Sequence, residues 1–498
     1  MERENPQTDL TNAASDSLYE QMDFSRDKRY PLMLAVLFAP IFMVILDIFI
    51  VNVVAPSLHS DLGASNSQVQ WVVAAYLLTY AISLITGGRL GDVFGRRRMF
   101  RLGVVGFTAA SALCAVAPTP NALIAARLLQ GFTGAAMWPQ VLSIIQVEFS
   151  AAERPRAFGI QGLVQGLAAI AGQIVGGGLI ALDPAGLGWR SVFLINVPVG
   201  LIAFIAAGRM IPESRSETAR RLDLAGVGLA SLVLALIMVP LVEGRDLGWP
   251  PAVFVALAAA VPAAGLFIAV ERRVAARGGS PLAELHLFED RGFRFGLLSA
   301  VILYNVISFF LLLSIYLQEG LGLSAIDAGL AFTPLAIAFV AASLTGPRLA
   351  EGLRDRMPQI GAAITAMGLL ATSLVVADNA SGSVSVTLIL SLVPFGAGMG
   401  LAVPNLINLV LRAVPTDDAG AASGMLVTSQ QIGNALGVAI IGTIFFGALG
   451  SSTSPSAFGH AFVVAMSVQL GLAVCAAALL TRARERVAHA RTPAIEGA

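Results

Sequence analysis

The chain carries very little charge for its length. Of its 498 residues only 12% are Asp, Glu, Lys or Arg, whereas 56% are hydrophobic. A water-soluble domain has about 25% charged residues, so this composition excludes an ordinary soluble protein and indicates a membrane protein. The formal net charge is zero. We therefore expect no nucleic-acid partner, because nucleic-acid binding depends on a basic surface.

Cysteine and histidine are also scarce. The only cysteines, Cys114 and Cys475, lie in apolar runs, which excludes a disulfide framework as the basis of the fold. The four histidines are scattered and form no pattern of metal ligands. We therefore expect no metal and no other cofactor. Paired carboxylates and a nucleophile triad are missing from the pattern as well, so we do not expect an enzyme.

Long apolar runs dominate what is present. A helix needs about 20 apolar residues to cross a bilayer, and lipid offers no partner to open backbone groups, so these runs are predicted to be membrane-spanning helices. The fold class is an all-α integral membrane protein with fourteen transmembrane helices. The predicted spans are 32–56, 69–90, 100–117, 121–148, 155–182, 188–211, 223–243, 250–271, 293–318, 325–350, 357–377, 383–412, 417–447 and 459–481.

The basic residues alternate from loop to loop. All of them except Arg127, Arg190 and Arg245 lie in the two tails or in alternate loops. Those loops lie near 91–101, 149–156, 209–221, 272–294, 348–356 and 412–417. Cytoplasmic loops retain Lys and Arg, so both termini are predicted to be cytoplasmic and the protein to lie in the plasma (inner) membrane. Two termini on one side require an even number of spans, which fourteen satisfies.

The longest internal loop divides the chain into parts. It follows the eighth predicted span and separates it from six more. A natural partition is two six-helix bundles with two inserted helices between them. The predicted parts are a cytoplasmic tail (1–30), an N-terminal bundle (31–211), the inserted helices (212–271), a cytoplasmic linker (272–292), a C-terminal bundle (293–481) and a second tail (482–498).

Two charged residues lie clearly inside predicted spans, where a charge is costly and so calls for a reason. Asp47 lies nine residues before Pro56 in the first span, and Arg127 lies about six residues inside the fourth. At about 1.5 Å per residue their depths differ by only ~4–5 Å. A nearby guanidinium favours an ionised carboxylate and burial favours a protonated one, so we predict that Asp47 loads and unloads a proton. The alternative is a static pair that orients two helices.

The turn between the second and third spans is rich in glycine and arginine. Glycine permits a tight turn, and an aspartate among arginines can form charge-assisted bonds that break when helices rearrange. A plain positive-inside loop explains the arginines but not the spacing of glycine and aspartate. The predicted residues of a conformational switch are Gly88, Asp92, Gly95, Arg96 and Arg97.

The fifth predicted span is unusually rich in glycine. Small residues let helix backbones approach closely and slide past one another. Static packing and a hinge role are both open at this point. The glycines are Gly159, Gly162, Gly166, Gly172, Gly176, Gly177 and Gly178.

Polar and aromatic residues near mid-span are candidates for a substrate cavity, although each alone is more often a helix-packing contact. The second half has no carboxylate clearly inside a span, which favours neutral, monocationic or amphipathic substrates. The candidates are Asn52, Trp138, Gln165, Tyr304, Asn305, Phe309, Asn405, Asn408, Gln430 and Asn434.

These motifs resemble the major facilitator superfamily, specifically its fourteen-span drug:proton antiporters, over nearly all of residues 30–481. Leu46-Asp47 through Pro56 is similar to the family's first-span signature, and Gly88 to Arg97 to the superfamily's loop motif. Arg127, Gln130 and Gly131 resemble the fourth-span motif, and Gly172, Gly176 and Gly177 the antiporter motif of the fifth span. The chain departs from the family pattern at Phe49, where Thr is usual, and at Gln173, where Pro is usual.

The resemblance implies two six-helix bundles that rock around a central cavity, a role for Arg127 in proton coupling, and a monomeric exporter of small lipophilic compounds such as antibiotics or dyes. The expected partners are therefore a small-molecule substrate, protons and the lipid bilayer. The alternative is a transporter of the same fold that moves a specific metabolite, lipid or siderophore.

Overall fold

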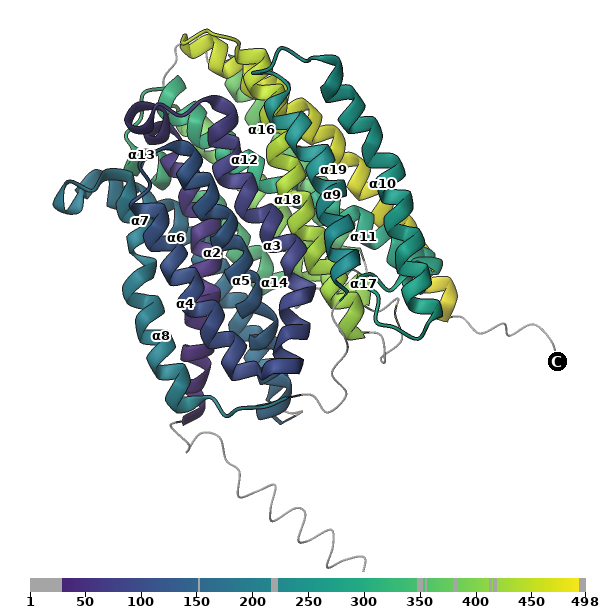
Figure 1. Ribbon diagram of the computed structural model, residues 1–498. Coiled ribbons are helices and arrows are strands. Elements are labelled where there is room, and N and C mark those ends of the chain that lie inside the picture. Colours follow the sequence, from purple (N-terminus) through teal and green to yellow (C-terminus); the bar gives the residue numbers. More distant parts are fainter. Residues whose placement is uncertain are drawn as a thin grey trace, which may run out of the picture.

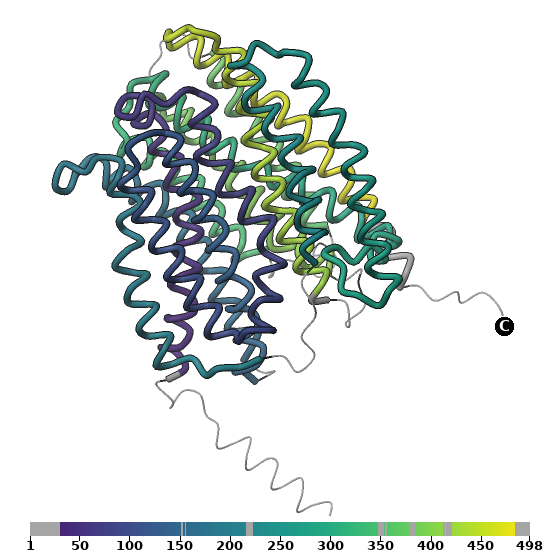
Figure 2. Tube along the Cα trace, in the orientation of Figure 1, coloured from purple at the N-terminus to yellow at the C-terminus, as the bar shows by residue number. Residues whose placement is uncertain are grey.

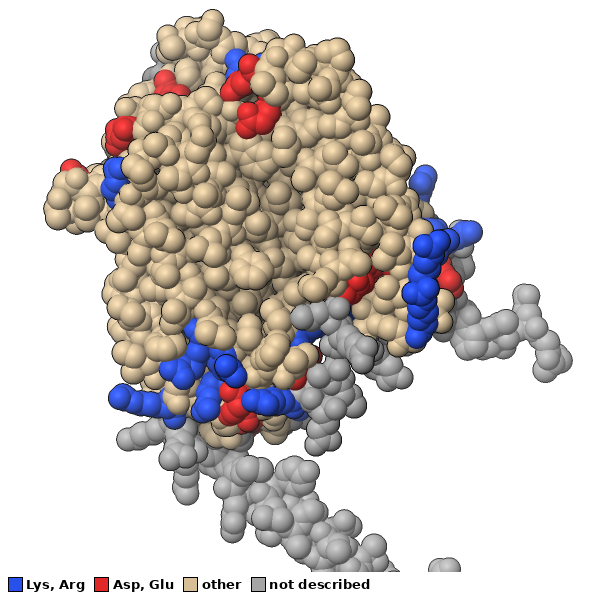
Figure 3. All heavy atoms as spheres, viewed as in Figure 1, with Lys and Arg blue, Asp and Glu red and all other residues tan. Residues whose placement is uncertain are grey.

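The computed structural model describes residues 29–150, 153–215, 223–346, 353, 356–378, 384–411, 414 and 419–491. Within these residues every regular element is a helix, and thirteen helices are long and apolar enough to cross a membrane. The helices run side by side (Figure 1). Charged atoms gather toward the two ends of the molecule, with a broad uncharged band between them (Figure 3). The predicted all-helical membrane fold is confirmed, whereas the predicted count of fourteen spans is not confirmed by the described residues.

The first helices form one group, on the left in Figure 1. α5 packs against α3 and α4, while α2 packs against α6 and α8. α5 is not among the thirteen apolar helices because it carries Arg127, Gln130 and Gln140, all of them buried. The group consists of α2 (Arg29–Leu62), α3 (Asn66–Phe94), α4 (Arg96–Ala115), α5 (Pro120–Glu148), α6 (Arg154–Leu182), α7 (Ser191–Leu194) and α8 (Asn196–Met210).

Local capping explains where several of these helices begin. The Ser65 side chain accepts a hydrogen bond from the Gln68 backbone N–H at the start of α3, and Gln68 reciprocates in a capping box. Thr119 caps α5, and Pro120 occupies its first turn, where a missing N–H has no cost. Gly95 links α3 to α4 with φ of 105°, a conformation that favours glycine.

α9 (Leu224–Glu243) and α10 (Pro251–Ala276) form a pair in the middle of the sequence. Asp223 caps α9 by accepting a 2.8 Å hydrogen bond from the Gly226 N–H. α9 packs against α3 and α18 (Ala419–Leu449), whereas α10 buries few of its residues. The pair therefore lies along the outside of the molecule, as the trace in Figure 2 shows.

The remaining helices form a second group. The predicted span 293–318 is a broken path with a 3-10 turn at Tyr304–Val306 and a π turn at Tyr316–Gly320. α16 packs against α17 and α19, and α11 packs against α18 and α19. The elements are η3 (Leu285–Glu289), α11 (Arg291–Leu303), η4 (Tyr304–Val306), α12 (Ile307–Ile315), η5 (Tyr316–Gly320), α13 (Ala325–Ala331), α14 (Thr333–Thr345), α16 (Met357–Asp378), α17 (Val386–Leu411), α18 and α19 (Pro455–Arg491).

Two helices extend beyond the predicted ends of their spans. α10 continues to Ala276, into the stretch predicted as linker, and α19 continues to Arg491, through most of the predicted tail 482–498. Both extensions are rich in Arg and Ala, which are strong helix formers. Most of the predicted tail 1–30, and parts of the loops near 348–356 and 412–417, lie outside the described residues.

The two groups meet along three lines of contact. α3 packs against α18, α6 against α13, and α2 against α12. We call the end that carries the α3–α4 turn, the C-terminus of α8 and the C-terminus of α10 the basic end. It is the lower end in Figure 3, where most of the visible Lys and Arg gather.

Candidate functional site

An ion pair lies inside the first helix group. The Arg127 Nη1 of α5 donates to the Asp47 Oδ2 of α2, and both side chains are fully buried. The two residues therefore lie at one level of the molecule, as their similar depths predicted.

Further donors hold the carboxylate in place. Asp47 Oδ1 accepts from Gln130 Nε2 at 2.8 Å and from Asn196 Nδ2 of α8 at 3.2 Å. Gln130 also accepts from Arg127 Nη1 at 2.7 Å and donates to Ser111 Oγ of α4 at 2.8 Å. One carboxylate thus joins α2 to α5 and α8, and through Gln130 to α4.

The guanidinium has its own set of contacts. Arg127 Nε donates to the Val72 carbonyl of α3 at 2.9 Å, and its guanidinium carbon lies 4.3 Å from the centroid of the Tyr76 ring. Phe193 of α7 offers a second ring at 5.9 Å. Arg127 Nη2 is buried without a hydrogen-bond partner among the described residues. These contacts hold the charge in place even if the carboxylate is neutralised.

Protonation of Asp47 would change this arrangement directly. A protonated carboxyl loses its charge and one of its acceptor sites, so the strongest contact between α2 and α5 weakens when Asp47 binds a proton. In a low-dielectric interior such a change in one charge is worth far more than it is in water.

The chain matches a known protein family over most of its length. The model of the Major Facilitator Superfamily matches residues 37–438, which is most of the chain. The chain belongs to the Major Facilitator Superfamily. It is therefore a multi-pass membrane transporter.

The chain is similar to several bacterial transport and resistance proteins. It is 42% identical to the probable actinorhodin transporter of Streptomyces coelicolor, over 83% of this chain and 72% of that protein. It is 34% identical to the puromycin resistance protein of Streptomyces alboniger, over 90% of each chain. It is 30% identical to the multidrug resistance protein Stp of Mycobacterium tuberculosis, over 83% of this chain and 76% of that protein.

Solved structures confirm the superfamily fold. A bacterial homologue of the lysosomal transporter Spinster, inward-facing and occupied, aligns with a TM-score of 0.66 at 17% identity, over 94% of this chain and 99% of that one. A proton-dependent oligopeptide transporter aligns with a TM-score of 0.66 at 15% identity, over 93% of this chain and 100% of that one.

The superfamily's loop motif forms a compact turn at the basic end. Arg96 and Asp92 form an ion pair at 3.0 Å across the turn, and Arg97 lies 3.7 Å from Glu213. A Cβ on Gly88 would lie 3.3 Å from the side chain of Pro139 in α5, and a Cβ on Gly95 would clash with Glu213. In this conformation the turn is bound to α5 and to the segment after α8. Arg89 also donates to the carbonyls of Ser280 and Pro281, which ties the turn to the linker that precedes the second helix group.

Gly172, Gly176 and Gly177 of α6 face two different helices. A Cβ on Gly172 would lie 2.8 Å from the Phe49 Cβ, and one on Gly176 would lie 2.7 Å from the Ile50 side chain, both in α2. A Cβ on Gly177 would lie 2.8 Å from the Ile326 Cα in α13. Gly172 and Gly176 therefore allow α6 to pack within its own group, while Gly177 allows α6 to touch the other one.

The first-half substrate candidates differ in burial. Asn52 is fully buried and neither of its amide atoms has a hydrogen-bond partner among the described residues. Trp138 is nearly buried, and Gln165 is half-buried. Asn52 is the most informative of them because an unpaired buried amide is costly unless a ligand or water binds it.

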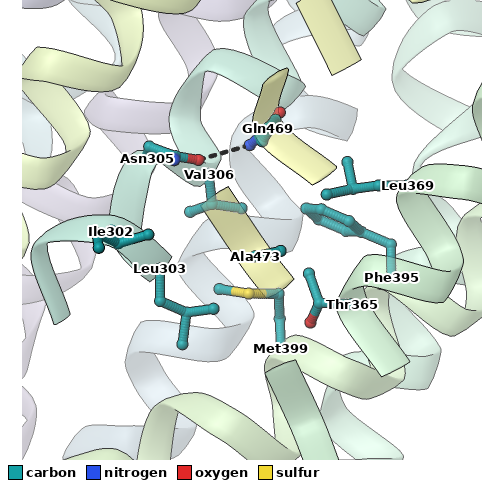
Figure 4. Close-up of a pocket in the computed structure, with 10 residues that line it drawn as sticks. All are labelled: Ile302, Leu303, Asn305, Val306, Thr365, Leu369, Phe395, Met399, Gln469 and Ala473. Carbon is teal, nitrogen blue, oxygen red and sulfur yellow. Dashed lines mark hydrogen bonds between the residues drawn. The ribbon is translucent and has the colours of Figure 1, made fainter. Parts of the chain in front are cut away.

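Two second-half candidates lie in the interior of the second group. Phe309 is fully buried, with its ring stacked on Phe395 at 4.0 Å. Asn305 accepts a 2.8 Å hydrogen bond from Gln469 Nε2 (Figure 4). The cavity beside them has a volume of about 10 Å³, far below the roughly 300 Å³ of a small-molecule pocket.

The remaining candidates are spread over three helices. Tyr304 is half-buried at the 3-10 turn. Asn405 and Asn408 donate to carbonyls of their own helix α17, and Asn408 is exposed. In α18, Asn434 donates to Gln431 at 2.9 Å, and the amide nitrogen of Gln430 has no partner among the described residues. The structure therefore does not bring all the candidates to one place.

Sequence reasoning missed a polar contact between the two groups at the end opposite the basic one. His59 Nδ1 of α2 lies 2.9 Å from Glu319 Oε1 of η5, and Gln318 Nε2 donates to the Val53 carbonyl at 3.2 Å. His59 and Glu319 do not stand out in the sequence, since each is an ordinary polar residue near the end of a predicted span. Nearby, the Phe49 ring lies 5.0 Å from Phe310 in an edge-to-face contact.

Removing this polar contact should loosen that end of the molecule. His59 and Glu319 are both about a quarter exposed, so their contact is weak. We expect Glu319→Ala to shift the equilibrium between the closed and open forms of this end only about two- to fivefold. The reporter is Val53→Cys, a fully buried position, labelled with a maleimide in purified protein that also carries Cys475→Ala. Asp61→Ala is the control, since Asp61 is exposed and bonds Ser60 next to it. Equal labelling rates in Glu319→Ala and the parent would contradict the prediction.

Proposed function

We propose that this protein is a proton-coupled antiporter that exports small lipophilic compounds by alternating access. The observation that carries the proposal is the fully buried Asp47–Arg127 pair, whose carboxylate links three helices and whose charge changes with a single proton. The names of its relatives, which include antibiotic transporters and resistance proteins, support export.

The proposed topology follows the charge distribution. Counting α5 with the thirteen apolar helices makes fourteen spans, with both termini and the basic end in the cytoplasm and the protein in the plasma membrane. The proposed parts are a bundle over 31–211, inserted helices over 212–271, a linker over 272–292 and a bundle over 293–481, with tails at 1–30 and 482–498. We propose that one copy is sufficient for transport, because the Asp47 site is complete within one chain.

The conformation described here is proposed to face the cytoplasm. The contacts of α6 and α2 with the second group lie toward the end opposite the basic one, at Gly177, His59 and Phe49. Nearer the basic end, a Cβ on Gly159 or Gly162 would meet nothing within 4 Å. In the proposed cycle the contacts at the far end open while α6 closes at the basic end.

The Asp47 proton is proposed to drive this change. With Asp47 ionised, α2 is held to α5 by the pair with Arg127. When Asp47 is protonated that contact weakens, and α2, which also carries the contacts to the second group, is free to move. In the proposed antiport cycle Asp47 takes up a proton from outside while the transporter faces outward. On return to the conformation described here the pair with Arg127 re-forms and the proton is released to the cytoplasm, so protons enter as substrate leaves.

The proposed substrates are neutral or carry a single positive charge, and are largely apolar. Among the residues between the two groups, aromatic rings such as Phe49 and Phe310 offer flat apolar contacts, and Asn52 offers an unpaired amide. Trp138 and Gln165 are proposed to contribute from α5 and α6. We leave Phe309 and Asn305 out of the proposed cavity because their partners lie within the second group.

Transport in everted membrane vesicles tests the proposal. The vesicles come from cells that overproduce the protein, with vesicles lacking it as control, and the substrates are a panel of lipophilic dyes and antibiotics. With the vesicle interior acidified, we expect accumulation that a protonophore abolishes. Accumulation that is the same with and without the proton gradient would contradict antiport. Transport of one hydrophilic metabolite alone would favour a dedicated metabolite transporter instead.

A further inference from the structure

A groove with a volume of about 340 Å³ opens at the basic end between α4 and α8. It shares no residue with the Asp47 site. Its lining residues are Arg97, Arg98, Arg101, Leu102, Phe204 and Glu213. The groove is therefore basic on one side and apolar on the other, at the end of the molecule where Lys and Arg gather (Figure 3).

The groove holds more positive charge than its own acid can neutralise. Glu213 is already engaged, since it lies 3.7 Å from the Arg97 side chain and accepts from the Arg97 backbone N–H at 3.1 Å. Arg98 and Arg101 have no acidic partner in the part of the chain that the structure describes. Arg101 Nε is buried and has no hydrogen-bond partner there either. Two guanidinium groups are thus left for an anion from outside the chain.

The position of Arg101 is fixed by its neighbours. Its guanidinium carbon lies 4.3 Å from the centroid of the Phe204 ring, and a Cβ on Gly208 would lie 3.1 Å from that same carbon. The flat guanidinium therefore lies on α8 between a ring and a glycine. A guanidinium held in this way loses little freedom when it binds a phosphate or carboxylate through two parallel hydrogen bonds.

The apolar side of the groove continues along the lipid-facing surface. Leu102 is 55% exposed, and Val105 in α4 and Leu201 and Ile205 in α8 are also exposed. Arg101 lies five residues into α4, about 7.5 Å from the helix start. That depth matches the headgroup layer, with the exposed apolar residues toward the acyl chains. A soluble anion without acyl chains would gain nothing from contact with these apolar residues.

We propose that this groove binds an anionic phospholipid, with its phosphate between Arg98 and Arg101 and its acyl chains along Leu102 and the exposed apolar residues of α8. Basic pockets between membrane helices on the cytoplasmic side are suited to such headgroups. A lipid bound here connects α4 to α8, the last helix before the inserted pair.

Native mass spectrometry of the purified full chain tests the proposal. The protein is titrated with phosphatidylglycerol and with phosphatidylcholine, and bound lipid is counted. We expect a clear preference for phosphatidylglycerol. Arg98→Gln with Arg101→Gln should weaken it by about fivefold for each arginine, or about 25-fold together. Arg294→Gln is the matched control, because Arg294 is also exposed at the basic end and lies 5.9 Å from the Phe295 ring, yet lies outside the groove.

A lysine variant and a competition experiment complete the test. The charge-preserving variant Arg98→Lys with Arg101→Lys should recover part of the affinity, because lysine keeps the charge but not the two parallel hydrogen bonds, and this separates loss of charge from loss of folding. Glycerol 3-phosphate at millimolar concentration should not displace the lipid, because it lacks the acyl chains. Equal loss in Arg294→Gln, an unchanged lipid preference in the double glutamine variant, or displacement by glycerol 3-phosphate would each overturn the proposal.

Discussion

Asp47→Asn is expected to abolish coupled transport. The substitution keeps the size of the side chain and its hydrogen-bond acceptor but removes the group that binds a proton. One coupled proton moving through 100 mV supports a substrate ratio of about fiftyfold, and without coupling that ratio falls to about one. The measurement is accumulation in everted vesicles with an imposed proton gradient. Protonophore-sensitive accumulation by Asp47→Asn would remove Asp47 from the mechanism.

The same substitution also has a structural consequence that must be separated from coupling. Asp47→Asn leaves the Arg127 guanidinium fully buried without its counter-charge. Breaking a buried ion pair by removing one partner costs roughly 3–5 kcal/mol. We therefore expect a clear fall in Tm for the purified single variant.

A double variant separates the two effects. Asp47→Asn with Arg127→Gln removes both charges, so its Tm should recover most of the loss, while coupled transport stays absent. A static pair that merely orients α2 and α5 predicts the opposite, namely that transport returns together with stability. Asp61→Asn, in the exposed last turn of the same helix, is the control and should transport like the parent.

The sequence predicted the pairing of Asp47 and Arg127 because depth in a membrane can be counted from helix ends at a constant rise. It did not reveal Asn196 or Ser111 as parts of the network. Those two come from α8 and α4, and which face of each helix turns toward Asp47 depends on helix rotation, which an evenly apolar span does not encode. Buried charge was visible in the sequence, whereas its neutral partners on α4 and α8 were not.

The substrate candidates show the same limit more strongly. Asn305 and Phe309 lie on a predicted span, but a 3-10 turn at Tyr304–Val306 and the approach of α18 decide which way they face. A Cβ on Gly437 would lie 2.7 Å from the Asn305 Cα, so α18 closes over that side. A polar residue at mid-span therefore does not by itself tell which interior of the molecule the residue faces.

The glycines of α6 support a sharper test, because adjacent glycines have opposite surroundings. A Cβ on Gly177 would lie 2.8 Å from the Ile326 Cα and would also clash with the Ala325 carbonyl oxygen, whereas a Cβ on Gly178 would meet nothing within 4 Å. Backbone atoms cannot move aside as a side chain can. Gly177→Val therefore separates α6 from α13, while Gly178→Val adds the same side chain where there is room.

Gly177→Val is expected to reduce transport at least about tenfold, because the contact between the two helix groups at this end must form once in every proposed cycle. Labelling of the Val53→Cys reporter should rise in parallel, since that position is sealed by the same end of the molecule. Gly178→Val should match the parent in both measurements. If Gly177→Val transports normally and its reporter stays protected, the close contact between α6 and α13 at Gly177 is not required for transport. If transport is lost with the reporter still protected, the fault lies in folding or in substrate binding. Only loss of transport together with exposure of the reporter agrees with a gate that closes between Gly177 and Ala325.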